Sequence, residues 1–413
     1  MMADILAHKH IILGITGGIA AYKAATLCSR LVQAGATVDV VMTEAAQQFI
    51  TPLTFQALTH RRIYHDIFDI PDGENIPHIS LADQADLLII APATTNTLAK
   101  LANGLADNLL TTIALATPAP ILVAPAMETD MWQHPATQSN MAKLEQWGVT
   151  LAGPAEGRLA SGAVGRGRMV EPEEILDMAR LRLAQAGDLA GCNLVVTAGG
   201  TRETIDPVRF ISNHSTGKMG YAIAHAARDR GAKVTLISTA SLSVPIGVAL
   251  IPVDSAQQMR DAVMDVVRLA DVLIMSAAVA DFRPATVAEQ KIKKKADSSI
   301  GMSIDLVRTP DILADVATYK NQMAQNGDVV CPKVTIGFAA ESENLLTNAE
   351  GKLKRKNLDM IAANNISASD AGFGVDTNRV TLLMADGKKE ELPLMSKRSV
   401  AEIILDKVMG LLH

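Results

Sequence analysis

The chain has 413 residues, a length that suggests two domains rather than a single hydrophobic core. Hydrophobic residues make up 48% and charged residues 20%, with a formal net charge of −6, a globular profile that argues against nucleic-acid binding. Aromatic residues are only 3%, so platforms for stacking bases are not expected either.

The cysteines and the apolar runs bear on where the protein works. Cys28, Cys192 and Cys331 are scattered and odd in number, which predicts neither a disulfide framework nor a zinc site. The apolar run at 11–13 is too short for a signal peptide, and no run reaches the length of a membrane span. We therefore expect a cytoplasmic protein that does not engage a membrane.

The first half alternates strands and helices, the pattern of a doubly wound α/β domain with a mostly parallel sheet. The predicted strands are residues 11–15, 37–42, 85–91 and 119–124, and the predicted helices are 19–34, 140–147 and 172–186. Gly35 is expected to cap the first helix.

The second half repeats this plan. GATVDVVMT at 35–43 is echoed by GAKVTLIST at 231–239, and ADLLII at 85–90 by ADVLIM at 270–275. A polar, glycine-flanked link near 186–191 marks the boundary, so we expect two tandem Rossmann-like domains, 1–187 and 188–413. The echo is architectural and does not require a shared function.

The stretch from 194 to 220 has the layout of a nucleotide site. A buried strand at 194–197 breaks at Gly199-Gly200, and a polar loop ending in STGK leads into a helix at 221–230. Backbone N–H groups at a helix start suit phosphate, although the glycine spacing is not that of a Walker motif. An ordinary connection between strand and helix fits these residues equally well.

Polar residues also follow the strands of the first half. GITGGIAAYK at 14–23 lacks the spacing of a dinucleotide site, so a mononucleotide phosphate at the helix start is preferred. The residues concerned are Gly17, Gly18, Thr43, Thr94, Asn96 and Thr97. Each threonine or asparagine alone is also explained as a helix cap or a turn residue.

His78 lies in PHISL, just before a predicted short helix that Ser80 and Asp83 would open as a capping box. A single histidine there is usually structural, but in a cleft it is suited to act as a base.

GITGGIAAYK, PHISLADQAD, APATTNT and PAMETDMW resemble the flavin-containing cysteine decarboxylases. With its second half, the whole chain resembles the bifunctional family of phosphopantothenoylcysteine decarboxylase and phosphopantothenate–cysteine ligase of coenzyme A biosynthesis. The resemblance implies FMN in the first domain, held by the glycines and polar residues named above, with His78 as a catalytic residue. FMN would oxidise the cysteinyl thiol, which eases loss of CO₂, and would then reduce the resulting ene-thiol.

Two positions depart from the decarboxylase pattern. Glu128 stands where the family has an asparagine that holds the substrate carboxylate, and an ionised Glu128 would repel that carboxylate. Ser161, in GRLASGAVGRGRM at 157–169, stands at a cysteine that donates the last proton, and a hydroxyl is a much weaker acid than a thiol. We expect a working decarboxylase; the alternatives are a ligase with an altered flavin domain, or a non-catalytic flavin-binding regulatory protein.

The second half matches the ligase signature in DPVRFISNHSTGK at 206–218, where the resemblance assigns Asn213 to the acyl-cytidylate intermediate. Lys291, in KIKKK at 291–295, would contact the triphosphate, although a lysine run is usually a solvated face. Asp281, otherwise explained as a helix cap, would bind the nucleotide or help to hold Mg²⁺. The other residues of the implied CTP site are Ala277, Thr309, Pro310, Asp311, Ile312, Phe338, Lys352 and Lys356.

These matches imply a reaction in two steps. The carboxylate of 4′-phosphopantothenate attacks CTP, pyrophosphate leaves, and the cysteine amine then displaces CMP from the acyl-cytidylate. The resemblance also implies homo-oligomers, with trimeric flavin domains and paired ligase domains. NLDMIAAN at 357–364 resembles the final core strand of the ligase domain.

Overall fold

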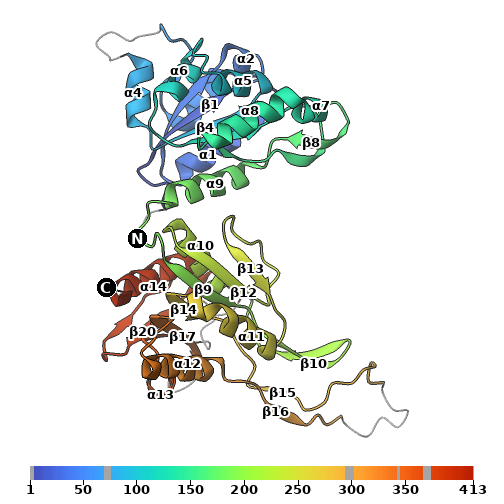
Figure 1. Cartoon of the computed structure of the whole chain (residues 1–413), viewed down its shortest axis with the longest axis vertical. Coiled ribbons are helices and arrows are strands. Elements are labelled where there is room, and N and C mark those ends of the chain that lie inside the picture. Colours follow the sequence, from blue (N-terminus) through green and yellow to red (C-terminus); the bar gives the residue numbers. More distant parts are fainter. Residues whose placement is uncertain (1–3, 69–75, 294–301, 342–344, 366–373, 413) are drawn as a thin grey trace. The chain divides into compact units, whose positions relative to one another are not determined.

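The computed structural model describes residues 4–68, 76–293, 302–341, 345–365 and 374–412. The chain divides into two compact units between Gln185 and Ala186 (Figure 1). In the described part, no helix is long and apolar enough to cross a membrane.

The first unit is built on a six-stranded sheet in which every neighbouring pair is parallel. Buried apolar runs form its central strands, as expected for strands covered on both faces. In spatial order the strands are β3 (Ile63–Tyr64), β2 (Thr37–Met42), β1 (His10–Ile15), β4 (Leu87–Ala93), β5 (Ile121–Pro125) and β6 (Thr150–Leu151).

Helices cover both faces of this sheet, and each face has its own apolar cluster. On one face lie α1 (Ala21–Gln33), α3 (Pro52–Thr59) and α9 (Pro172–Ala184). On the other lie α4 (Pro77–Gln84), α5 (Thr95–Ala102), α6 (Leu109–Ala116) and α8 (Pro135–Gln146). The short helices α2 (Glu44–Gln47) and α7 (Thr129–Gln133) follow β2 and β5.

The second unit contains an eight-stranded sheet that is parallel through its first six strands and antiparallel at one edge. In spatial order the strands are β13 (Ala249–Pro252), β12 (Lys233–Ser238), β9 (Asn193–Ala198), β14 (Val272–Met275), β17 (Val334–Glu341), β18 (Met360–Asn365), β20 (Val380–Met384) and β21 (Lys389–Glu391). The predicted fold class, two mostly parallel doubly wound sheets, is confirmed.

Residues 357–364 contain most of the core strand β18, as expected, but β18 is not the last core strand. Strand β18 is followed in the sheet by β20, which pairs with it antiparallel and is itself largely buried. The sheet therefore extends beyond β18, and its outermost strand is the exposed β21. A hairpin brings β20 and β21 together, which antiparallel strands permit without a crossover helix.

Helices again cover both faces of the second sheet. One face carries α10 (Lys218–Asp229) and α14 (Lys397–Leu412), and the other carries α11 (Ala256–Val266), η1 (Val267–Leu269), α12 (Ile312–Asn326) and α13 (Leu345–Arg355). Two antiparallel ribbons, β10 (Arg202–Asp206) with β11 (Arg209–Ser212) and β15 (Phe282–Pro284) with β16 (Leu306–Arg308), extend away from the sheet (Figure 1).

Two further antiparallel pairs are small. In the first unit β7 (Ala155–Arg158) pairs with β8 (Val164–Arg168), and in the second β19 (Thr377–Asn378) pairs with β22 (Met395–Ser396).

Helix α10 starts earlier than the sequence predicts, at Lys218 rather than residue 221. Its N-cap is Gly217, whose φ of +82° lies in the left-handed region. A Cβ at this position would also lie 2.7 Å from the Cβ of Ala240. Gly217 is therefore required twice over, for its backbone conformation and for the close packing of its loop.

We expect Gly217→Ala to lower the free energy of unfolding by about 2–4 kcal/mol, because a strained φ and a steric overlap add together. Gly191→Ala is a matched control: its φ is +83°, but among the described residues nothing lies within 4 Å of the added Cβ. That control should cost about 1–2 kcal/mol, from the strained conformation alone. Denaturant unfolding measures both changes, and equal losses would show that the contact with Ala240 is unimportant.

Candidate functional site

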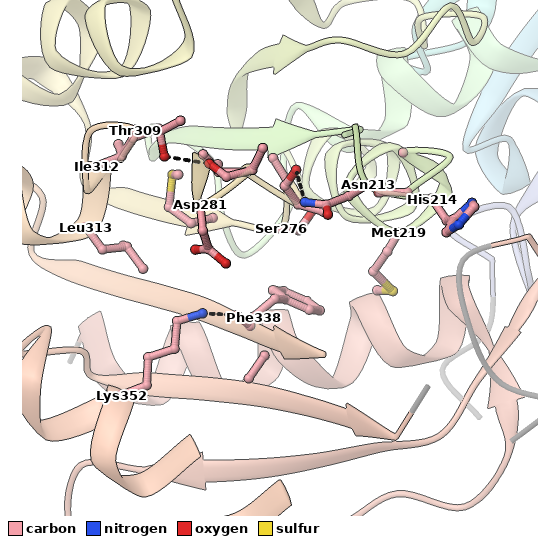
Figure 2. A pocket seen from close by; sticks show the side chains of 18 of the residues that line it. Asn213, His214, Met219, Ser276, Asp281, Thr309, Ile312, Leu313, Phe338 and Lys352 are labelled. Atoms are coloured by element: carbon pink, nitrogen blue, oxygen red, sulfur yellow. Dashed lines mark hydrogen bonds between the residues drawn. The ribbon is translucent and has the colours of Figure 1, made fainter. Parts of the chain in front are cut away.

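The second unit holds a cavity of about 930 Å³ at the carboxyl ends of its parallel strands (Figure 2). Ligands bind at this edge in open α/β sheets. Nearly all of the predicted nucleotide and acyl-site residues line it, and these are Asn213, Ala277, Asp281, Thr309, Pro310, Asp311, Ile312, Phe338, Lys352 and Lys356.

Hydrogen bonds between two loops shape the wall of the cavity. The buried Thr197, near the end of β9, accepts the Ala277 N–H at its Oγ1 (3.1 Å), and its carbonyl accepts the Ser276 hydroxyl (2.7 Å). One step further, the Ala278 N–H donates to the Gly199 carbonyl at 2.8 Å. The loops after β9 and β14 are thus held side by side.

Asn213 lies on the loop that leads to α10. Its Nδ2 donates to the Ala278 carbonyl at 3.1 Å, which connects the amide to the neighbouring loop. A Cβ on Gly200 would lie 2.7 Å from the Asn213 carbonyl oxygen, so the small residue lets the two loops approach. The side chain is exposed and lines the cavity.

Asp281 and Thr309 form part of another wall. The Thr309 N–H donates to the Asp281 carbonyl (3.0 Å), and the Thr309 hydroxyl donates to the Ala280 carbonyl (2.5 Å). The Asp281 side chain is therefore not needed to hold its own backbone. Figure 2 shows its carboxylate entering the cavity from the side opposite Lys352.

Two lysines supply positive charge from α13 and the turn after it. Lys352 Nζ donates to the Phe338 carbonyl at 3.1 Å, and Lys356 forms an ion pair with Asp311, which caps α12. Burial lowers the pKa of Lys356, an effect that the negative charge of Asp281 opposes. A bound anion would stabilise this partly desolvated ammonium group.

The cavity also contains Lys218, the lysine of the STGK stretch, and Lys397, which the sequence analysis did not select. Lys218 Nζ donates to the Gly374 carbonyl (3.0 Å) and to Asp376 Oδ1 (2.7 Å), and Lys397 is 6% exposed in the first turn of α14. Burial and the charge of Lys218 lower the pKa of Lys397, while Asp376 opposes that shift. Lysine in the first turn of a helix opposes the helix dipole, which is a signal the sequence does contain.

Lys291 does not line the cavity. It is exposed, and the residue after it is tied to the β10–β11 ribbon, because the Ile292 N–H donates to Asp206 Oδ2 (3.1 Å) and Arg209 Nη2 donates to the Ile292 carbonyl (3.0 Å). Lys294 and Lys295 lie outside the described residues. The expectation that Lys291 joins the other nucleotide residues in one site is not met within this chain.

A metal site made by side chains alone was sought in the part of the chain that the structure describes. Among the described residues, no group of three or more His, Cys, Asp or Glu side chains is placed to hold a metal ion.

In the first unit, the loops after β1 and β4 are joined in a similar way. The buried Thr16 donates its hydroxyl to the Pro92 carbonyl (2.7 Å), and the Thr94 N–H donates to Thr16 Oγ1 (3.1 Å). Gly17 is closely packed, since a Cβ added at this position would lie 2.5 Å from the Cβ of Ala45. Gly18 is less crowded, because the nearest atom to a Cβ at this position would be Thr94 Cγ2 at 3.9 Å, an ordinary van der Waals distance.

Thr43 and Thr94 act as helix caps. Thr43 accepts the Ala46 N–H (3.3 Å), and Thr94 accepts the Thr97 N–H (3.4 Å) and hydrogen-bonds the Thr97 hydroxyl (3.2 Å). Asn96 is exposed in the first turn of α5. Both the capping explanation and a binding role fit these residues, since a capped helix start still presents free N–H groups.

His78 is the second residue of α4, which begins at Pro77, so the predicted capping box is wrong. Proline starts the helix earlier than Ser80, and Ser80 accepts a hydrogen bond from Gln84 within the helix. The His78 ring is half-buried, and its Nδ1 is buried without a partner in the described part of the chain. A buried ring nitrogen of this kind is suited to a ligand or a proton-transfer role.

Glu128 and Ser161, the two departures from the decarboxylase pattern, are in direct contact. The Ser161 hydroxyl donates to Glu128 Oε2 at 2.9 Å. Glu128 precedes α7, and Ser161 lies in the turn between β7 and β8. Met127, beside Glu128, accepts a hydrogen bond from the Thr95 hydroxyl at its Sδ (3.3 Å). The Glu128–Ser161 pair therefore lies next to the start of α5.

Comparisons with known proteins cover both units. Residues 3–183 match the family model described as Flavoprotein, and residues 189–412 match the DNA/pantothenate metabolism flavoprotein C-terminal domain. The Coenzyme A biosynthesis bifunctional protein CoaBC of Bacillus subtilis (strain 168) is 48% identical over 98% of this chain and 98% of its own length. The protein of the same name from Escherichia coli (strain K12) is 45% identical, covering 98% and 97%.

A crystal structure of the C-terminal domain of a Coenzyme A biosynthesis bifunctional protein CoaBC is 40% identical, with a TM-score of 0.44. It covers 54% of this chain and 97% of that chain.

Proposed function

The chain belongs to the family of bifunctional coenzyme A biosynthesis proteins, and from this premise we propose which cofactors and residues serve its two reactions. It is an enzyme with a ligase and a decarboxylase activity. We propose that the second unit joins cysteine to 4′-phosphopantothenate with CTP, and that the first unit decarboxylates the product. The gathering of ten expected residues around one cavity is the observation that carries the ligase proposal.

In the ligase half, the substrate carboxylate attacks the α-phosphorus of CTP and pyrophosphate leaves. The cysteine amine then attacks the acyl-cytidylate, and CMP leaves. Lys352 and Lys356 place positive charge in the cavity, and the Asn213 amide orients the acyl phosphate without adding charge. The uncapped start of α10 at Gly217 offers backbone N–H groups to a phosphate.

We propose that Mg²⁺ enters the ligase site together with CTP. Mg²⁺ is commonly bound by one or two carboxylates together with substrate phosphates and waters. Asp281 provides one carboxylate inside the cavity, which suits this arrangement without a set of protein ligands.

In the flavoprotein half, we propose that FMN is held by Gly17, Gly18, Thr43, Thr94, Asn96 and Thr97. The lack of crowding at Gly18 and the joined loops of Thr16 and Thr94 support this proposal. When bound, FMN supplies reversible oxidation of the cysteinyl thiol, which eases the loss of CO₂. His78, with its unpartnered Nδ1, is proposed to move a proton at the substrate.

The alternative of a ligase with an inactive flavin half is not favoured, since relatives match both halves over 98% of the chain. A purely regulatory flavoprotein is not favoured for the same reason.

We also propose a homo-oligomer in the cytoplasm, with trimeric flavin domains and paired ligase domains. Ile19, Tyr22, Ile76 and Ile79 are exposed apolar residues beside the proposed flavin residues and His78. Val208, Phe210, Phe282, Leu306 and Val307 are exposed along the two ribbons of the ligase unit. Such clusters are typical of subunit contacts, and the three free cysteines fit a reducing compartment.

Incubation with 4′-phosphopantothenate, cysteine, CTP and Mg²⁺ should yield 4′-phosphopantetheine, pyrophosphate and CMP. Mass spectrometry of the products measures this outcome. Accumulation of 4′-phosphopantothenoylcysteine would instead show that only the ligase half is active, and omission of CTP should abolish all products.

Lys356→Gln should weaken CTP binding about tenfold to a hundredfold, because a charge-assisted hydrogen bond contributes roughly 1.5–3 kcal/mol. Lys354→Gln is the matched control, an exposed lysine of the adjacent helix turn that does not line the cavity. Calorimetric titration with CTP and Mg²⁺ compares the two variants. Equal affinities would remove Lys356 from the nucleotide site.

Lys291→Gln tests the residue that lies outside the cavity. If Lys291 reaches the triphosphate in the working assembly, the variant should release pyrophosphate about a hundredfold more slowly while its flavin absorbance stays unchanged. An unchanged ligation rate would show that Lys291 takes no part in the reaction.

A further inference from the structure

Glu128 and Ser161 form a hydrogen-bonded pair although they are 33 residues apart. Glu128 follows β5 and is the N-cap residue of α7, whereas Ser161 lies in the turn of the β7–β8 hairpin. Both residues differ from the decarboxylase pattern, so the contact suggests that the two differences belong together.

Backbone contacts hold the hairpin against the turn that carries Glu128. The Met127 N–H donates to the Gly167 carbonyl at 2.9 Å. A Cβ on Gly167 would lie 2.3 Å from the Met127 carbonyl oxygen, and a Cβ on Gly165 would lie 2.4 Å from Thr129 Oγ1. The two glycines therefore permit an approach that any side chain would prevent, and they place the hairpin turn beside Glu128.

The Ser161 hydroxyl takes part in two hydrogen bonds. The Ala163 N–H donates to Ser161 Oγ at 3.3 Å, so the serine oxygen already acts as an acceptor within its turn. Its single hydrogen is then directed to Glu128 Oε2. Ser161 thus orients the carboxyl group, and among the described residues Glu128 Oε1 has no hydrogen-bond partner.

The reaction proposed for this unit consumes one proton in each turnover. The bond between carbon and the carboxylate breaks, CO₂ leaves, and a new C–H bond takes its place, so R–CO₂⁻ and H⁺ give R–H and CO₂. The electrons that the flavin takes up in the oxidation are returned in the later reduction. The net reaction therefore requires only one proton. Some group of the protein must deliver it.

Three candidate donors of the first unit are Glu128, Ser161 and Cys28. A carboxylic acid gives up its proton far more readily than an alcohol, which favours Glu128 over Ser161. Cys28, the single cysteine of the first unit, is buried in α1, and burial raises the pKa of its thiol to about 12. Glu128 is only half-buried, so its carboxyl group is accessible to water.

We propose that Glu128 delivers this proton and that Ser161 is a positioning residue that orients the Glu128 carboxyl group. The inference rests on the proposed decarboxylase function and extends it to named residues. The proposal also explains how a glutamate can stand beside the substrate carboxylate. Two neighbouring carboxylates favour a state in which they share one proton. A substrate carboxylate bound beside Glu128 would bring about such sharing before CO₂ is lost.

The test compares Glu128→Gln, Glu128→Asp and Ser161→Ala in the full-length flavin-loaded protein, with 4′-phosphopantothenoylcysteine as substrate. Glutamine can still accept the serine hydrogen bond but has no acidic proton. Glu128→Gln should therefore lower kcat about a hundredfold or more, whereas Glu128→Asp should recover part of that loss. Ser161→Ala should lower kcat about tenfold. Glu156→Gln, an exposed carboxylate of β7, is the matched control and should leave kcat unchanged.

A second readout does not depend on turnover. Trypsin cleavage at Arg158 and Arg166 reports how firmly the hairpin is held, and it can be followed with flavin absorbance and the unfolding temperature. Glu128→Gln should resist trypsin as the unmodified protein does, whereas Ser161→Ala should be cleaved faster.

Undiminished kcat in Glu128→Gln would overturn the inference, and so would a folded, flavin-loaded Glu128→Asp that is as inactive as Glu128→Gln. Either result would leave the decarboxylase function intact. Failure of the unmodified protein to release CO₂ from this substrate would instead contradict the proposed function itself.

Discussion

A buried threonine at the carboxyl end of a central strand joins two loops in each unit. Thr16 bonds the loop after β4 through Pro92 and Thr94, and Thr197 bonds the loop after β14 through Ser276 and Ala277. Buried hydroxyls are usually hydrogen-bonded, and the partners of these two hydroxyls are backbone groups of the neighbouring strand end and loop. Gly17, Gly18 and Thr94 of the first candidate site, and Ala277 and Asp281 of the second, stand on these loops. The spacing of these five residues therefore depends on the hydrogen bonds of the two threonines.

The sequence was informative where the sheets are parallel. Strands buried on both faces appear as uninterrupted apolar runs, and the loops after them meet at one edge of the sheet. Thr94 and Thr97 in the first unit, and Ala277 and Asp281 in the second, could therefore be placed near candidate sites before any contact was known. The start of α4 was misjudged because Pro77 opens the helix earlier than the serine that looked like its cap.

Other features depend on contacts that local patterns do not contain. The position of Lys291 follows from the bond between Ile292 and Asp206, which are 86 residues apart. The pairing of Ser161 with Glu128 depends on how closely a hairpin approaches a turn, and that distance is set by Gly165 and Gly167. Lys397 enters the cavity because α14 begins beside it, a matter of topology that residue type alone does not reveal.

Each unit is complete in its apolar packing. The clusters of the first unit draw their buried members from between Leu6 and Ala179, and those of the second from between Leu189 and Val408. A cut between Gln185 and Ala186 would remove no side chain from any of these cores. The covalent link between the units is therefore not needed to complete either apolar core. Its lasting effect is on stoichiometry, since every translated ligase half arrives with one flavoprotein half, and the cell cannot make the two activities in unequal amounts.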